Sequence, residues 1–260
     1  MEETASKKSR FEASRQRAIR TPRLDRRVGP ALGTSSVWSE VAGKLLLRIA
    51  AVSIVTLSVS AAAPGFESPD LLFREDWRES AAELPISQAH VSNGELALEV
   101  WGPGLHGIKK SNHPQIPNDP FYVWSGACPG NWAVSLKHRK SDLDLRGGAR
   151  IRWRSRQSGF RELRIILRLA DGKWLVSDAS DGPSEDWRIR EFELAKVRWR
   201  TLDISRVAEG KWAAAPDLGR VEAVGFTDLM PGGLSDACSR LDWIEVYGSA
   251  VERAVRVPQP

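Results

Sequence analysis

A segment rich in histidine and lysine is the first place in this sequence where side chains could do chemistry. The stretch 101–113 reads WGPGLHGIKKSNH and contains His106, Lys109 and His113, and Tyr122 follows it. An imidazole or a phenol can take a proton while a nearby ammonium stabilises the enolate that forms. That is the chemistry of β-elimination on a uronate. The competing interpretation is that these are solvated loop residues without a catalytic role.

The same stretch spaces Gly102, Gly104 and Gly107 as G-x-G-x-x-G, the fingerprint of a dinucleotide-binding loop. That fingerprint requires a helix directly after the glycines. Here they are followed by IKKSNHPQIPNDP, whose three prolines exclude a helix. The sequence therefore predicts no nucleotide cofactor. It predicts instead a long irregular loop up to Pro120, and such loops in compact domains are often functional.

Carboxylates in pairs, which a glycoside hydrolase needs, occur as Glu75 with Asp76 and as Asp242 with Glu245. No catalytic strand of E-x-D-x-E type accompanies them, and no G-x-S-x-G elbow offers a serine nucleophile. Asp76 and Asp242, on the presumed first and last strands, are instead candidates to hold a structural Ca²⁺ through their oxygens. Asp242 could equally satisfy a backbone group near Arg240. Apart from this calcium, no cofactor is predicted.

Tryptophan is the outstanding feature of the composition, because ten of the eleven lie after residue 64. An exposed indole can stack on a sugar ring, whereas a buried one fills the core of a sandwich well. Three alternate in phase with apolar neighbours and are expected in the core: Trp153, Trp199 and Trp243. Three others lie at strand ends or in loops and are the candidates for ligand contact: Trp101, Trp124 and Trp212.

Arginines alternate along several of the predicted strands. If those strands are neighbours in one sheet, their outer face is rich in arginine. The planar guanidinium grips carboxylate or sulfate groups through two hydrogen bonds, so such a face would suit an acidic polysaccharide. The alternative is a solvated face on which aspartates and glutamates pair with the arginines, and an even mixture of charges would remove the hypothesis. The candidate residues are Arg152, Arg154, Arg164 and Arg168.

The elements that must position these residues are short strands. Apolar and polar residues alternate in IRWRS (151–155) and LRIILRL (163–169), and Asp171-Gly172 predicts a hairpin with a type I′ turn. Similar short runs are separated by glycine, proline, asparagine and aspartate, and no long helical period occurs past residue 64. The sequence predicts an all-β antiparallel sandwich over residues 64–250, followed by a tail at 251–260.

The N-terminal part differs from the rest. Residues 1–40 are predicted to be a disordered leader or the product of a wrongly assigned start, and residues 41–63 have the order of a signal peptide. The apolar run is shorter than the roughly 20 residues of a spanning helix, so only an uncleaved signal-anchor would join the chain to a membrane. Residues 1–63 hold 11 basic and 5 acidic residues, which leaves 27 basic and 28 acidic. Nucleic-acid binding is therefore not predicted, and export to the periplasm or the cell exterior is.

The two cysteines, Cys128 and Cys238, both lie in the part predicted to be exported. An oxidising compartment favours a disulfide between them. The alternative is a pair of free thiols. Zinc is not expected, because neither cysteine has a second ligand at metal spacing.

The final strands carry a resemblance to a known group. VEAVGFTD, a glycine-rich loop and LDWIEVYG (241–248) resemble the closing strands of galactose-binding-like jelly rolls. The order of DLRGGARIRWRS, ELRIILRLADGKW and VRWRTLDI is similar to the same group, so the resemblance spans residues 70–248. The group includes many carbohydrate-binding modules and the domain of complex I intermediate-associated proteins.

This resemblance implies a jelly-roll sandwich whose commonest role is to bind a glycan, and it carries over no catalytic residue. Together with the residues above, it leads to the expectation of an exported carbohydrate-binding domain, with a glycan as partner. The alternatives are a polysaccharide-active enzyme, a lyase before a glycoside hydrolase, and a protein-interaction or assembly domain.

Overall fold

The computed structural model describes residues 69–126, 128–232 and 236–253. In these ranges the regular structure consists of antiparallel strands and three short 3₁₀ turns, so the all-β prediction is confirmed. The leader and signal-peptide predictions fall outside the described residues. None of the helical turns in the described ranges has the length and apolar character of a membrane span.

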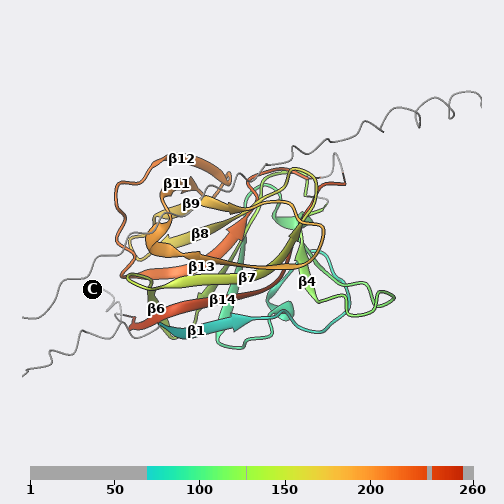
Figure 1. The fold of residues 1–260 in the computed structure, drawn as a ribbon, viewed down its shortest axis with the longest axis horizontal. Coiled ribbons are helices and arrows are strands. Elements are labelled where there is room, and N and C mark those ends of the chain that lie inside the picture. Colours follow the sequence, from blue (N-terminus) through green and yellow to red (C-terminus); the bar gives the residue numbers. More distant parts are fainter. Residues whose placement is uncertain (1–68, 127, 233–235, 254–260) are drawn as a thin grey trace, which may run out of the picture. The chain divides into compact units, whose positions relative to one another are not determined.

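Fourteen described strands form two layers that are joined through one strand (Figure 1). Sheet A has the order β10-β7-β14, with β1 and β4 on the other edge of β14 and β3 beside β4. Its strands are β1 (Asp70–Glu75), β3 (Lys109–Ser111), β4 (Tyr122–Trp124), β7 (Arg150–Gln157), β10 (Arg188–Glu193) and β14 (Ser239–Glu252).

Sheet B has the order β2-β5-β13-β8-β9-β11-β12, with β6 beside β13. Its strands are β2 (Leu96–Trp101), β5 (Ala133–His138), β6 (Ser141–Asp144), β8 (Leu163–Leu169), β9 (Trp174–Asp181), β11 (Trp199–Asp203), β12 (Ala208–Trp212) and β13 (Val221–Thr227). The 3₁₀ turns are η1 (Gln88–His90), η2 (Leu105–Gly107) and η3 (Leu194–Lys196).

Strand β14 belongs to both layers. It pairs with β7 up to Tyr247 and then with β6 from Ser249 onward. Gly248 stands at the change of partner, where a Cβ would lie only 2.5 Å from the carbonyl oxygen of Asp144. Glycine therefore lets the strand pass from one sheet to the other at close backbone approach. The strand extends to Glu252, two residues into the segment that the sequence assigns to a tail.

The core lies between the two sheets and is built from the inward residue of each alternating pair. Trp153 and Trp199 lie in it, as predicted. Trp243 is buried but does not belong to this core. A β-bulge between Leu241 and Trp243 inserts one extra residue and places the indole on the outer face, under the guanidinium of Arg74 at 4.3 Å.

The β8–β9 hairpin forms at the predicted place, but with a different turn. Leu169 and Lys173 close it, since the amide of Leu169 donates to the carbonyl of Lys173 at 2.9 Å. Gly172 has a φ of +84°, whereas Asp171 is not in the left-handed region. A type I′ turn needs positive φ at both central residues. The loop therefore has three residues, and only its glycine adopts positive φ.

The predicted disulfide is not formed. Cys128 and Cys238 are free thiols, both buried, and the sulfur of Cys238 lies 3.3 Å from the hydroxyl of Ser158. Burial raises the pKa of the Cys128 thiol to about 12, and the nearby Asp228 adds to the shift. Sequence spacing could not decide this pairing, because it carries no information on how two distant loops orient their side chains.

Free buried thiols predict a specific labelling result. We expect an aromatic disulfide reagent to react negligibly with the native protein at pH 8, because the reactive species is the thiolate and Cys128 is held protonated. Without reductant, the two cysteine thiols of the denatured chain should then react and release two equivalents of thiolate from the reagent. Absorbance of the released thiolate measures both values. Zero thiols in denaturant would show that the two cysteines are bonded in the purified protein.

Candidate functional site

The outer face of sheet B gathers aromatic and charged side chains from five adjacent strands. On β2 the residues Leu96 and Leu98 enter the core, so Glu99 and Trp101 project outward. The registers place Glu99 opposite Ser135 on β5 and, one strand further, Ser135 opposite Gly225 on β13. We call this region the tryptophan face. Its residues are Glu99, Trp101, Ser135, Lys137, Arg168, Trp174 and Glu222.

Two tryptophans meet above this face. The rings of Trp101 and Trp174 lie edge to face, with centroids 5.3 Å apart and planes inclined by 67°. They come from β2 and β9, which are separated by three strands and so by about 19 Å in a flat sheet. Sheet B must curve to bring the rings together. The indole nitrogen of Trp101 donates to the hydroxyl of Ser135 at 2.9 Å, which fixes its orientation.

Charged groups border the tryptophan pair. The Oε2 atom of Glu222 lies 3.4 Å from Nε of Arg168 and 3.6 Å from Nζ of Lys137. The Arg168 contact is an ion pair whose geometry is not that of a hydrogen bond, so Nε of Arg168 is a buried donor without an acceptor. Oε2 of Glu99 is a buried acceptor without a donor. Both atoms are enclosed by protein, whereas the side chains of Lys137, Arg168 and Glu222 are partly exposed and can exchange hydrogen bonds with a bound hydroxyl group.

The turn between β11 and β12 covers the adjoining part of sheet B. Val207 is fully buried in a second apolar cluster with Ile166 and Val176. The amide of Asn131 donates to the carbonyl of Val207 at 3.0 Å. Gly102 lies against the same turn, where a Cβ would be 2.5 Å from a methyl group of Val207. The turn therefore borders the tryptophan face on one side and packs against its floor.

The four predicted arginines do not share a face, so the hypothesis of one arginine-rich surface is wrong. Arg152 and Arg154 lie on β7 in sheet A, whereas Arg164 and Arg168 lie on β8 in sheet B. The chain crosses between layers after β7, although the two strands are consecutive in sequence. Each arginine is also paired with a carboxylate: Arg152 with Glu191 and Glu245, Arg154 with Asp242, Arg164 with Glu209, and Arg168 with Glu222.

Two further tryptophan candidates lie away from the tryptophan face. Trp124 is on β4 of sheet A, under the ammonium of Lys109 at 5.6 Å. Trp212 is on β12, the edge strand of sheet B, and is 47% exposed. The guanidinium groups of Arg200 and Arg198 lie 4.1 and 4.6 Å from its ring centroid. Only Trp101 of the three candidates joins the cluster on sheet B.

The structure brings two of the predicted catalytic residues together. The hydroxyl of Tyr122 lies 3.1 Å from Nδ1 of His113, which is also 3.0 Å from Oδ2 of Asp119. His106 lies separately on η2, and Lys109 lies over Trp124. Burial raises the pKa of Tyr122, so its phenol is protonated at neutral pH and is a poor base for proton abstraction.

The two calcium candidates are both neutralised by arginines. Asp76 receives hydrogen bonds from Arg74, the shortest at 2.6 Å, and Asp242 receives one from Arg154 at 2.7 Å. In the described part of the chain, no three histidine, cysteine or acidic side chains are placed to hold a metal ion. Calcium at Asp76 and Asp242 stays an untested prediction.

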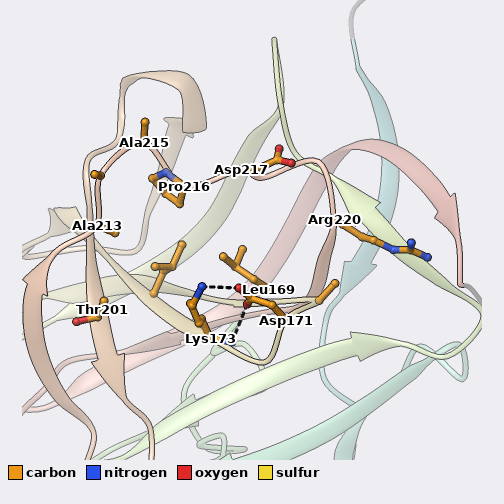
Figure 2. Close-up of a pocket in the computed structure, with 12 residues that line it drawn as sticks. Leu169, Asp171, Lys173, Thr201, Ala213, Ala215, Pro216, Asp217 and Arg220 are labelled. Atoms are coloured by element: carbon orange, nitrogen blue, oxygen red, sulfur yellow. Dashed lines mark hydrogen bonds and ion pairs between the residues drawn. The ribbon is translucent and has the colours of Figure 1, made fainter. Parts of the chain in front are cut away.

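A separate pocket of about 550 Å³ opens beside the β8–β9 turn. Figure 2 shows its two sides, with Leu169, Asp171 and Lys173 facing the segment from Ala213 to Asp217. Lys173 and Asp171 form an ion pair at 2.7 Å. None of the described residues that line the pocket is aromatic, so it offers no stacking platform for a sugar ring. For that reason the tryptophan face is the better candidate site.

Solved structures resemble this fold. The family 11 carbohydrate-binding module of a Clostridium thermocellum cellulosomal cellulase is similar with a TM-score of 0.39 and 12% identity, over 72% of this chain and 97% of that one. A family 29 carbohydrate-binding module from Piromyces equi has a TM-score of 0.36 and 14% identity, over 68% and 91%. These neighbours are carbohydrate-binding modules. No family model and no curated protein matches the sequence.

Proposed function

We propose that the chain binds a glycan through the tryptophan face. The observation that carries this proposal is the position of the Trp101–Trp174 pair beside the partly exposed polar side chains of Lys137, Arg168 and Glu222. A sugar ring offers apolar C–H surfaces for the partly exposed indole of Trp101, and its hydroxyls can donate to Glu222 and accept from Lys137 and Arg168. One ligand class therefore satisfies both features of the site.

The charges on this face favour a neutral glycan over the acidic polysaccharide that the sequence suggested. Lys137 and Arg168 contribute two positive charges, and Glu99 and Glu222 contribute two negative charges. A carboxylate or sulfate placed here would meet repulsion from the two glutamates as well as attraction. Export from the cytoplasm and a jelly-roll type of sandwich belong to the same proposal, whereas calcium does not, because its candidate ligands are occupied by arginines.

Affinity electrophoresis of the full chain against neutral and acidic polysaccharides tests the proposal. We expect at least one neutral polysaccharide to retard the protein, with no rise in absorbance at roughly 235 nm in the same mixtures, the region where a lyase product absorbs through its new C=C bond. Rising absorbance would show that the protein catalyses β-elimination, and the proposal of binding without catalysis would then be wrong. If no neutral chain retards the protein, the tryptophan face does not have the role proposed for it.

A further inference from the structure

A row of positive charges crosses sheet A on the side of the molecule away from the tryptophan face. The strand registers place Arg156 of β7 opposite Arg240 of β14, Arg240 opposite Trp124 of β4, and Trp124 opposite Lys109 of β3. The four residues therefore form one rung across four neighbouring strands. We call the three basic residues, Lys109, Arg156 and Arg240, the cation row.

All members of this rung point to the outer face. Their neighbours along the strands, Val123 on β4 and Leu241 on β14, enter the core. Lys110 on β3 and Gln157 on β7 are fully buried on the inner side. Because successive side chains of a strand alternate between its two faces, the rung residues face solvent together. Opposite residues in such a pair have Cβ atoms about 5 Å apart, and the row spans about 14 Å over three strand intervals.

The two arginines of the cation row differ from the other described arginines of sheet A in lacking acidic partners. Arg74, Arg152 and Arg154 each form an ion pair with a carboxylate. Among the described residues, no carboxylate forms an ion pair with a member of the cation row. The neighbour of Arg240 is the neutral phenol of Tyr122. Like charges directly opposite each other destabilise a sheet, and no carboxylate of the described residues forms an ion pair that offsets this cost.

The nearby acidic residues of the described chain form no ion pair with the cation row. Asp242 is bound by Arg154, and Asp119 lies against His113. Glu185 and Asp186 are exposed on the loop before β10, where the amide of Ser184 donates to the carbonyl of Gln157. Neither forms an ion pair with Arg156 or Arg240. The positive charge of the cation row is therefore available to a ligand.

Trp124 holds one end of the cation row in place. Its ring lies beneath the ammonium of Lys109, and a Cβ at Gly126 would overlap the same indole. Glycine at 126 therefore leaves room for the indole, over which the ammonium of Lys109 lies. Trp124 is a positioning residue for Lys109, since an ammonium over an indole face is attracted to it.

We propose that the cation row binds sulfate or carboxylate groups carried by an acidic polysaccharide, at a site separate from the tryptophan face. The guanidinium groups of Arg156 and Arg240 can bind such a group through parallel hydrogen bonds, and Lys109 supplies a point charge for a second group along the chain. The linear form of the row suits a polymer with repeated charges. This proposal does not rest on the proposed function, because it uses the other sheet and other residues.

The test compares dextran sulfate and polygalacturonate with uncharged dextran as ligands of the full chain. We expect the wild-type protein to bind a charged polymer and to release it as the salt concentration rises. We expect no salt-dependent binding to dextran. The double variant Arg156→Gln/Arg240→Gln should raise the dissociation constant for the charged polymer by about tenfold or more, since charged hydrogen bonds are lost. Arg198→Gln is the matched control, because Arg198 is an exposed arginine paired with Asp178, and we expect it to change binding less than about twofold.

Further variants separate a defined site from misfolding and from general attraction between opposite charges. The double variant should fold with an unchanged or higher melting temperature, because it removes a like-charge pair. Trp101→Ala should bind dextran sulfate as the wild type does, whatever its effect on neutral glycans. Equal binding by wild type and the double variant would overturn the proposal, as would an equal loss in Arg198→Gln. Binding of free sulfate, with no binding of either charged polymer, would also overturn it in favour of a small-ion site.

Discussion

Replacing Trp101 with alanine is expected to weaken glycan binding by about thirtyfold, the equivalent of the roughly 2 kcal/mol typical of a tryptophan at the centre of an interface. The substitution removes one of the two rings that meet above sheet B, and it removes the hydrogen bond that the hydroxyl of Ser135 accepts from the Trp101 indole. Trp174 is buried in the apolar cluster with Val207, so Trp174→Ala should lower the melting temperature as well as the affinity. Isothermal titration with the polysaccharide that retards the wild type measures the affinity of both variants.

Three variants of other side chains make this result specific. Phe160→Ala removes an aromatic residue that is 61% exposed and lies elsewhere, so it should bind as the wild type does. Trp212→Ala tests the remaining sequence candidate on sheet B and should also leave binding unchanged. Glu99→Gln keeps the packing and should reduce affinity by less than Trp101→Ala. Wild-type affinity in Trp101→Ala, with a normal melting curve, would exclude the tryptophan face as the site.

The second large effect concerns stability and is expected for Asp228→Ala. Asp228 and Arg161 form a buried ion pair with Nη1–Oδ2 at 3.2 Å. Asp228 also accepts a hydrogen bond from the hydroxyl of Ser239 at 3.0 Å, and Arg161 donates to the carbonyl of Pro231 at 2.7 Å. Removing the carboxylate leaves the guanidinium charged and unpaired in the interior, which typically costs about 3–5 kcal/mol. Urea denaturation followed by tryptophan fluorescence measures the loss.

The double variant Arg161→Met/Asp228→Leu separates the ion pair from the packing. Both charges are then absent, so the free energy of unfolding should fall by less than in Asp228→Ala. If the double variant loses as much free energy of unfolding as Asp228→Ala does, the effect arises from packing rather than from the unpaired charge. Burial also raises the pKa of Asp228. The folded state then favours the protonated form relative to the unfolded state. The contribution of Asp228 to stability therefore decreases as pH rises from the ordinary carboxyl pKa through the raised one.

The alternation of apolar and polar residues along single strands determined much of the architecture of this protein. The period of two in 151–155 and 163–169 predicted which side chains enter the core and which face outward, and Trp153 lies where it placed it. The alternation around Trp199 placed that residue in the core as well, where it lies. The prolines after Gly107 excluded a dinucleotide loop. Glu99, Ser135 and Glu222 are outward residues of such alternating strands in the structure. Nothing in their local sequence distinguished them from other solvated positions, and they were not chosen as candidates.

Only the tertiary structure decided which outward residues share a face. Strands β7 and β8 are consecutive but lie in different sheets, which divided the arginines, whereas β2 and β9 approach each other across a curved sheet and join Trp101 to Trp174. One bulged residue at Asp242 reversed the side on which Trp243 lies. Strand order, curvature and bulges arise from pairing between distant segments. A period read along one strand fixes the side of each residue but carries no information on its neighbour across the sheet.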